Sequence, residues 1–309
     1  MLLCLGGPAL LLSGGHGPHV VRSAWRVVLG SALGLGLATL TWMTATGAEA
    51  LGLGLDGLLR LQSVREVVGT SFGQVWAARI GLALALAWIA ALALQRRFGT
   101  RTGALAALAF GAGLALTFPL SGHARVEGVV GVASDATHTA AAGMWVGGLA
   151  VLCLALVTAG TERGSLLQHS VPPFSALALG SVAMLLATGI GNALIELPEL
   201  AALWETTYGR LVLAKGALLA VLVGAGALHR RVTLPKLRRA ERAGSRRLFL
   251  RLVGVELALM AVVVGVTAAL VAEPPRAAAT GSVSNESTIG RLDPALRDRS
   301  PDAFDFTAP

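Results

Sequence analysis

The sequence predicts an all-α membrane protein, a polytopic bundle of about eight transmembrane helices. Of its 309 residues, 54% are apolar and only 14% are charged, whereas a soluble domain is about 45–50% apolar and about 25% charged. The mean hydropathy is +0.70, and a soluble globule of this size could not bury so much leucine, alanine and valine. The composition excludes disorder for most of the chain and argues against a soluble enzyme. We therefore expect a protein without enzymatic activity whose main partner is the lipid bilayer.

Individual helices are predicted from the length of the apolar segments. A helix needs about 20 apolar residues to cross the ~30 Å hydrocarbon layer. Seven segments meet this requirement: 25–48, 74–94, 102–120, 133–158, 174–195, 209–228 and 249–272. An eighth candidate, Met1–Ser13, is apolar but shorter. Because proline cannot continue a helix, Pro274-Pro275 ends the last one. We expect a transmembrane domain over residues 1–275 and a polar, disordered tail over 276–309.

The loops alternate in charge, which predicts the orientation of the chain. Arginine and lysine gather at 13–26, 95–101 and 230–247, whereas 49–66 and 196–205 are acidic or mixed. Basic loops face the cytoplasm, so we expect both termini outside the cytoplasmic membrane. The same rule accounts for the net charge of +8, and we expect no nucleic-acid partner.

The two halves of the chain share short motifs at similar offsets. The matches are Gly6-Gly7 with Gly147-Gly148, Ala45-Thr46-Gly47 with Ala187-Thr188-Gly189, and Thr70 to Gly73 with Thr206 to Gly209. Their order predicts two parallel four-helix repeats, about 1–122 and about 132–275. The offset also places the start of the first helix before Met1, so we expect this helix to lack its outer turns and the true start to lie upstream.

Polar side chains at the predicted outer end are the candidate site. A histidine or carboxylate at membrane depth is costly unless paired, which makes each one a functional hypothesis. His123 follows the span 102–120, and Asp135 and His138 open the span 133–158. At 3.6 residues per turn, Asp135 and His138 share a face with Ala142 and Trp145. Imidazoles bind copper, zinc, nickel or iron, and a carboxylate can orient the ligating ring.

Met43 is the fourth candidate ligand. It lies in the span 25–48 at a predicted depth similar to that of His138, and a thioether suits Cu(I). Met144 lies on a different helical face from His138 and is not assigned to the site. Two alternatives stay open: His138 bonds Asp135 or a neighbouring helix without binding metal, and Met43 only packs.

Several motifs carry a resemblance to a known family. They are Ser121 to Ala124, Asp135 to His138, Trp145 to Gly148, Phe174 to Gly189, Thr207 to Lys215, and Arg251 to Glu256 ahead of the two prolines. In order and spacing the chain resembles the CopD family of bacterial copper-resistance membrane proteins. The resemblance implies an eight-helix inner-membrane protein of copper homeostasis that moves copper ions, as Cu(I) or Cu(II), across the membrane. It also implies a separate periplasmic CopC-like copper-binding partner.

Two other functions are compatible with the sequence. A haem-bearing electron carrier of the cytochrome b type needs histidines facing each other at similar depth, but only His138 lies well inside a predicted span. A copper-delivery factor for oxidase assembly, without net transport, has no feature in the sequence that separates it from a transporter.

Overall fold

The computed structural model describes residues 1–14, 16–122, 128–160, 163–196, 201–228, 231, 254–256 and 258–268. This part of the chain is helical and contains no strand. The α-helices are α1 (Leu2–Leu12), α2 (Pro18–Ala50), α3 (Leu61–Val68), α4 (Ser71–Leu94), α5 (Thr100–Leu120), α6 (Gly128–Ala142), α7 (Gly148–Thr158), α8 (Arg163–Glu196), α9 (Ala202–Glu205) and α10 (Thr207–Leu228). A 3-10 helix, η1 (Leu55–Leu59), and a π-helix, η3 (Gly143–Gly147), interrupt them.

The chain divides into two compact units, which are described separately. The first comprises residues 1–192 and 219–261, and the second comprises 193–218 and 262–309. The predicted polar tail at 276–309 and the basic run at 230–247 lie outside the described residues, apart from Arg231.

Six of the predicted spans are confirmed as helices long and apolar enough to cross a membrane. They are Pro18–Ala50, Ser71–Leu94, Thr100–Leu120, Gly128–Thr158, Gly164–Leu194 and Thr207–Ala227. The segment predicted at 249–272 is described only in part, as the shorter apolar helix Gly254–Ala268, and α1 is also short. The total of eight spans therefore stays a prediction.

The interior of the first unit is built on close glycine contacts between α1 and η3. A Cβ atom on Gly6 would lie 2.0 Å from the carbonyl carbon of Gly147, and one on Gly147 would lie 2.0 Å from the carbonyl oxygen of Leu2. Only glycine allows two helix backbones to approach this closely. α1 is consequently one of the most buried helices, with Cys4 to Leu11 all inside.

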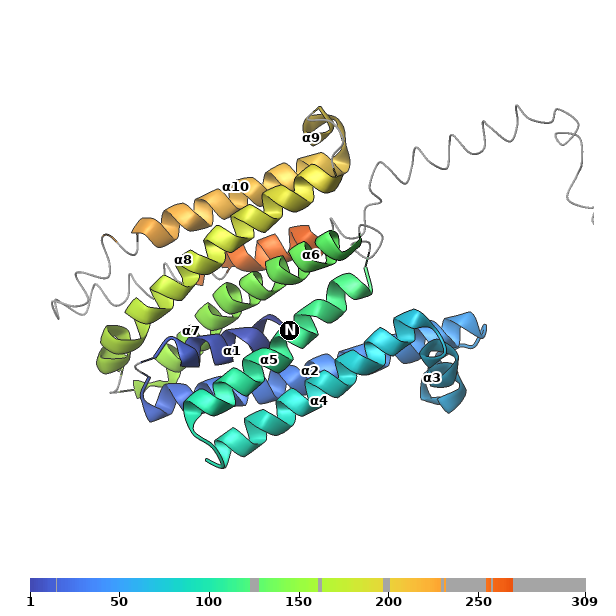
Figure 1. The fold of residues 1–309 in the computed structure, drawn as a ribbon, viewed down its shortest axis with the longest axis horizontal. Helices are drawn as coiled ribbons and strands as arrows, with labels where there is room; N and C mark the ends of the chain where they lie inside the picture. Colours follow the sequence, from blue (N-terminus) through green and yellow to red (C-terminus); the bar gives the residue numbers. More distant parts are fainter. Residues whose placement is uncertain are drawn as a thin grey trace, which may run out of the picture. The chain divides into compact units, whose positions relative to one another are not determined.

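Successive helices of the first unit run up and down, so their connections gather at two ends (Figure 1). One end, called the basic end below, carries exposed Arg22, Arg26, Arg96, Arg97 and Arg101. The opposite end carries α3 and the 51–60 loop, where exposed Glu49, Asp56 and Glu66 lie. Arg60 and Arg65 are exposed at this end too, so one end of the unit is basic and the other is mixed in charge, as the loop composition predicts.

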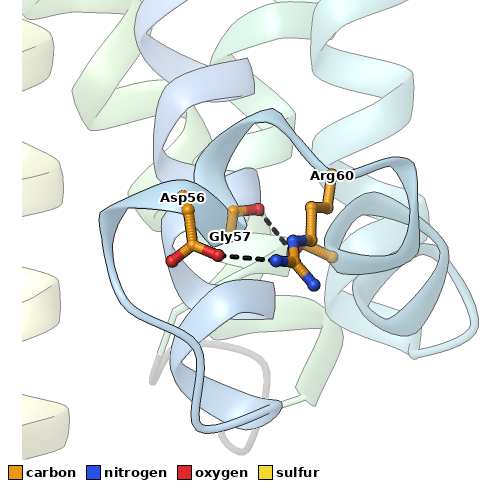
Figure 2. A network of polar contacts seen from close by, with 4 residues as sticks. Asp56, Gly57 and Arg60 are labelled. Carbon is orange, nitrogen blue, oxygen red and sulfur yellow. Dashed lines mark hydrogen bonds and ion pairs between the residues drawn. The ribbon is translucent and has the colours of Figure 1, made fainter.

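The 51–60 loop is closed by a small polar network (Figure 2). The guanidinium of Arg60 donates to the carboxylate of Asp56 at 2.7 Å. The backbone N–H of Arg60 donates to the carbonyl of Gly57 at 3.2 Å. Both charged side chains are more than half exposed, so the ion pair adds little stability. The buried hydroxyl of Ser63 also donates to the Gly57 carbonyl, at 2.7 Å, and fixes the loop against α3.

Two helix starts in different parts of the chain have matching local geometry. The Thr70 hydroxyl accepts from the Gly73 N–H at 3.0 Å, and the Thr206 hydroxyl accepts from the Gly209 N–H at 2.9 Å. Each threonine also donates its proton to a preceding carbonyl at 2.7 Å. These N-caps begin α4 and α10, because a side-chain oxygen satisfies a backbone N–H that the first turn leaves without a partner.

Candidate functional site

α6 carries two of the predicted ligands on one side of the helix. Asp135 and His138 are three residues apart, close to one full turn, and both side chains are half-buried. α6 lies between α5 and α8 at the end of the unit opposite the basic end (Figure 1). The sequence-based placement of these two residues on one helical turn is confirmed.

A hydrogen bond to α8 favours one tautomer of the His138 ring. Nδ1 of His138 lies 2.9 Å from Oγ1 of Thr188. The Thr188 hydroxyl donates its own proton to the carbonyl of Met184 at 2.7 Å, so it acts as acceptor toward the imidazole. Nδ1 therefore carries the proton and the lone pair of the neutral ring is on Nε2. That is the tautomer in which a histidine binds metal through Nε2 while a neighbour holds its other nitrogen.

Two further contacts fix α6 against α8 beside this ring. The hydroxyl of Ser134 donates to the side-chain oxygen of Asn192, one turn from the His138–Thr188 pair. A Cβ atom on Gly189 would lie 3.5 Å from Cε1 of His138, so the ring of His138 packs close to α8 at this glycine. Because both polar ties join α6 to α8, the ring is held by a neighbouring helix, which is one of the alternatives left open by the sequence.

His123 falls outside the described residues, which end at Gly122 and resume at Gly128. The structure therefore does not test whether its ring meets that of His138. Among the described residues, no group of three histidine, cysteine, aspartate or glutamate side chains is close enough to hold a metal ion. Whether His123 adds a ligand at this end stays a prediction.

Met43 occupies a buried position in α2, with 3% of its surface exposed. It lies one helical turn before Gly47, where a Cβ would lie 1.9 Å from the carbonyl oxygen of Ser63. This face of α2 is packed against the start of α3. Ligation of copper by Met43 stays a prediction.

The sequence analysis missed the polar network around Arg79. Arg79 is 9% exposed in the middle of α4, and its guanidinium donates to the Thr117 hydroxyl at 2.9 Å, the Thr117 carbonyl at 2.7 Å and the Ser121 hydroxyl at 2.8 Å. The ring of Phe118 covers it, with the guanidinium carbon 4.2 Å from the ring centroid. The signal was present, since an arginine inside an apolar span needs partners. The network joins α4 to Ser121, the residue that follows α5 and lies two positions before His123 in the sequence.

His16, at the basic end, also makes polar contacts that the sequence analysis missed. Nε2 of His16 donates to the carbonyl of Leu10 at 2.6 Å, and Nδ1 accepts from the Ser170 hydroxyl at 2.8 Å. Burial lowers the pKa of His16, and the bond to Leu10 partly offsets that effect. His16 thereby ties the α1–α2 connection to α8, a long-range pairing that composition and spacing do not reveal.

Comparisons with known proteins agree with these features. The family model described as copper resistance protein D-like, N-terminal domain, matches residues 1–132, and the model described as copper resistance protein D matches residues 168–270. Copper transport protein CutJ of Bacillus subtilis (strain 168) is 30% identical over 220 residues, which are 70% of this chain and 41% of that protein. The chain thus spans about two fifths of the length of this curated relative. No solved structure matches the chain.

The two family models match segments in both halves of the chain. The second matched segment contains Thr188, the α8 residue that bonds His138, whereas Asp135 and His138 lie between the two segments. Apolar spans, inward polar groups and the matched segments lead to one conclusion: the chain belongs to the CopD family, that of copper resistance protein D.

Proposed function

We propose that this chain is a copper-homeostasis membrane protein that moves copper ions across the cytoplasmic membrane. Copper would be captured at the outer end by His123, Asp135 and His138, with Met43 as a further ligand. The names of the family and of its relative in Bacillus subtilis support copper handling. In this proposal copper is the transported substrate, and it arrives from a separate periplasmic CopC-like protein.

The observation that carries the proposal is the His138–Thr188 pair. An imidazole can bind a copper ion only through a nitrogen with a lone pair. The Thr188 hydroxyl favours the tautomer with the proton on Nδ1, and this tautomer leaves Nε2 available as the ligating atom. Asp135, one turn away on α6, adds a negative charge that attracts a cation to this end of the bundle.

The proposal includes the orientation and the internal repeat. The arginines of the basic end support a cytoplasmic position for that end, which places His138 near the outside. The contact between Gly6 and Gly147 supports two parallel repeats, because residues that correspond to each other meet only on a pseudo-two-fold axis. The matching caps at Thr70 and Thr206 support the same relation.

Copper content and copper transport test the proposal. Purified wild-type protein is expected to retain copper that His138→Ala and His123→Ala lose, and cells expressing either variant should differ from wild type in copper accumulation. Met43→Leu tests the fourth ligand in the same assay. His169→Ala is the matched control, because His169 is exposed on α8 at the basic end and bonds the Ser165 carbonyl.

Equal copper content and equal accumulation in wild type and His138→Ala would refute the proposal. A Soret band in the purified protein would indicate the haem carrier instead. Loss of oxidase activity in a deletion strain, with unchanged copper uptake, would indicate a delivery factor without net transport.

A further inference from the structure

A groove runs between α5, α6 and α8 on a side of α6 that the His138 site does not use. Its upper part, about 680 Å³, is lined by Leu116, Thr137, Ala140, Met144, Ser181 and Met184, among others. A second hollow of about 430 Å³ continues from it toward the basic end. Both hollows share Met144, Ala176 and Leu177, so together they form one continuous groove along α8.

Two methionine side chains open onto this groove, Met144 where the two hollows meet and Met184 nearer the His138 end, with 47% of the surface of Met184 exposed. Met144 belongs to η3 and lines both hollows, and Met184 lies one turn from Thr188 on α8. Thioether sulfur is a soft, uncharged ligand that selects Cu(I) over harder cations. The groove therefore offers soft ligands from two different helices at a depth where charged ligands would be costly.

A buried hydroxyl without a partner points to a ligand in the same place. Ser181 is 4% exposed and lines the groove between the two methionines. Within the described residues its Oγ makes no hydrogen bond. A buried hydroxyl without a partner costs about 1–3 kcal/mol, and a cation or its last water molecule in the groove would supply the missing contact.

One face of α8 extends from the residue that bonds His138, past this groove, to the residue that bonds His16. Ser170, Pro173, Leu177, Ser181, Met184 and Thr188 follow one another at spacings of three or four residues, which places them on one side of the helix. Thr188 bonds His138 at one end and Ser170 bonds His16 at the other. Ser170 and Thr188 are 18 positions apart in the sequence, which corresponds to about 27 Å at ~1.5 Å per residue, close to the ~30 Å of a bilayer core.

From these observations we infer that Cu(I) crosses the bundle along the α6–α8 groove, where the thioethers of Met184 and Met144 bind it between the His138 end and the basic end. The inference rests on the proposed function and adds the path and the oxidation state of the ion. The ion stays Cu(I) throughout, so no electron or proton changes place. The occupant is a soft monovalent cation, and an acyl chain of a lipid is the competing occupant.

The first test removes the thioethers. Met144→Leu, Met184→Leu and the double variant keep the side-chain volume nearly constant, and Met260→Leu is the control, because Met260 is also buried but lies on the 254–268 helix. Full-length protein in proteoliposomes is offered Cu(I), and Ag(I) is used as an air-stable probe. We expect the double variant to lower uptake about tenfold, which corresponds to about 1.4 kcal/mol, and Met260→Leu to leave it unchanged.

The second test fills the groove without removing a ligand. A Cβ atom on Gly180 would meet no atom within 4 Å although this residue lines the groove, so Gly180→Leu extends a side chain into open space. Gly81→Leu is the control, since Gly81 on α4 also has no atom within 4 Å of its Cβ position. We expect Gly180→Leu to reduce uptake while copper capture at the His138 end persists.

X-ray absorption of bound Ag(I) separates the two proposals. Sulfur neighbours in wild type that disappear in the double methionine variant support the groove, whether or not transport is observed. Wild-type uptake by the double variant, or a lipid retained in the groove with unchanged sulfur neighbours, would overturn the inference. If His138→Ala abolishes capture while both groove variants transport normally, the proposed function stands and the groove does not.

Discussion

Replacing Thr188 by valine removes the acceptor that holds Nδ1 of His138 and leaves the shape of α8 almost unchanged. In the wild-type protein Oγ1 of Thr188 lies 2.9 Å from Nδ1 of His138, and the hydroxyl donates a hydrogen bond to the Met184 carbonyl. Without it, the ring loses both its orientation and the preference for a lone pair on Nε2. Loss of such a supporting contact typically lowers metal affinity about 10–100-fold, or about 1.4–2.7 kcal/mol. We expect a decrease of that size for Thr188→Val.

The affinity is measured by titrating the purified protein against a chromophoric Cu(I) chelator. Thr188→Ser keeps the hydroxyl and is expected to restore most of the affinity. Thr46→Val is the matched control: Thr46 donates to the carbonyl four residues earlier, as Thr188 does, and corresponds to it by position in the first half. An equal affinity for Thr188→Val and wild type, or an equal loss in both valine variants, would refute the reasoning.

Three further predictions concern stability, each read from thermal unfolding in detergent. Gly147→Ala places a Cβ 2.0 Å from the Leu2 carbonyl oxygen and should cost at least about 1–3 kcal/mol, whereas Gly34→Ala, with no atom within 4 Å, should cost nothing; equal melting temperatures would contradict this. Arg79→Met leaves three buried contacts without a donor and should cost about 1–3 kcal/mol, and an unchanged melting temperature would count against it. Because the pKa of His16 is lowered below 6.5 in the folded state, the unfolded chain binds the proton more readily, so stability should fall as pH drops below about 6.5; a His16→Gln variant with the same pH profile would argue otherwise.

Hydropathy predicted most of the fold because a bilayer constrains helix length so strongly. Six of the apolar segments are helices of sufficient length, and the charge of the loops predicts which connections gather at one end. The regular helical period of 3.6 residues was a less reliable guide to side-chain direction within the span 133–158. The π-helix Gly143–Gly147 adds residues to the turn, so a spacing of 3.6 from His138 no longer gives the face of Trp145. Nothing in the local sequence beyond Gly143, Gly147 and Gly148 marks this change of helix type.

The position of Asp135 and His138 on one turn of α6 was predictable from the sequence, but their contacts were not. Asp135 and His138 stand out as polar groups in an apolar span, and local spacing places them one turn apart. The partner of His138 is Thr188, 50 residues away, and a threonine in a transmembrane helix is too common to attract notice. The same holds for His16 and Ser170, which are 154 residues apart. Pairings of this kind depend on which helices are neighbours, and hydropathy does not determine that.

The distribution of ligand types along α8 follows from the cost of burial. Imidazoles are held at the two ends of this helix face, by Thr188 and by Ser170, where the helix nears water. Between them the groove presents the thioethers of Met144 and Met184, which are apolar and carry no proton. An imidazole or carboxylate at that depth would cost several kcal/mol without a partner, whereas a thioether is stable there both with and without a metal. The proposed path for a soft cation therefore has polar ligands at its ends and sulfur ligands between them.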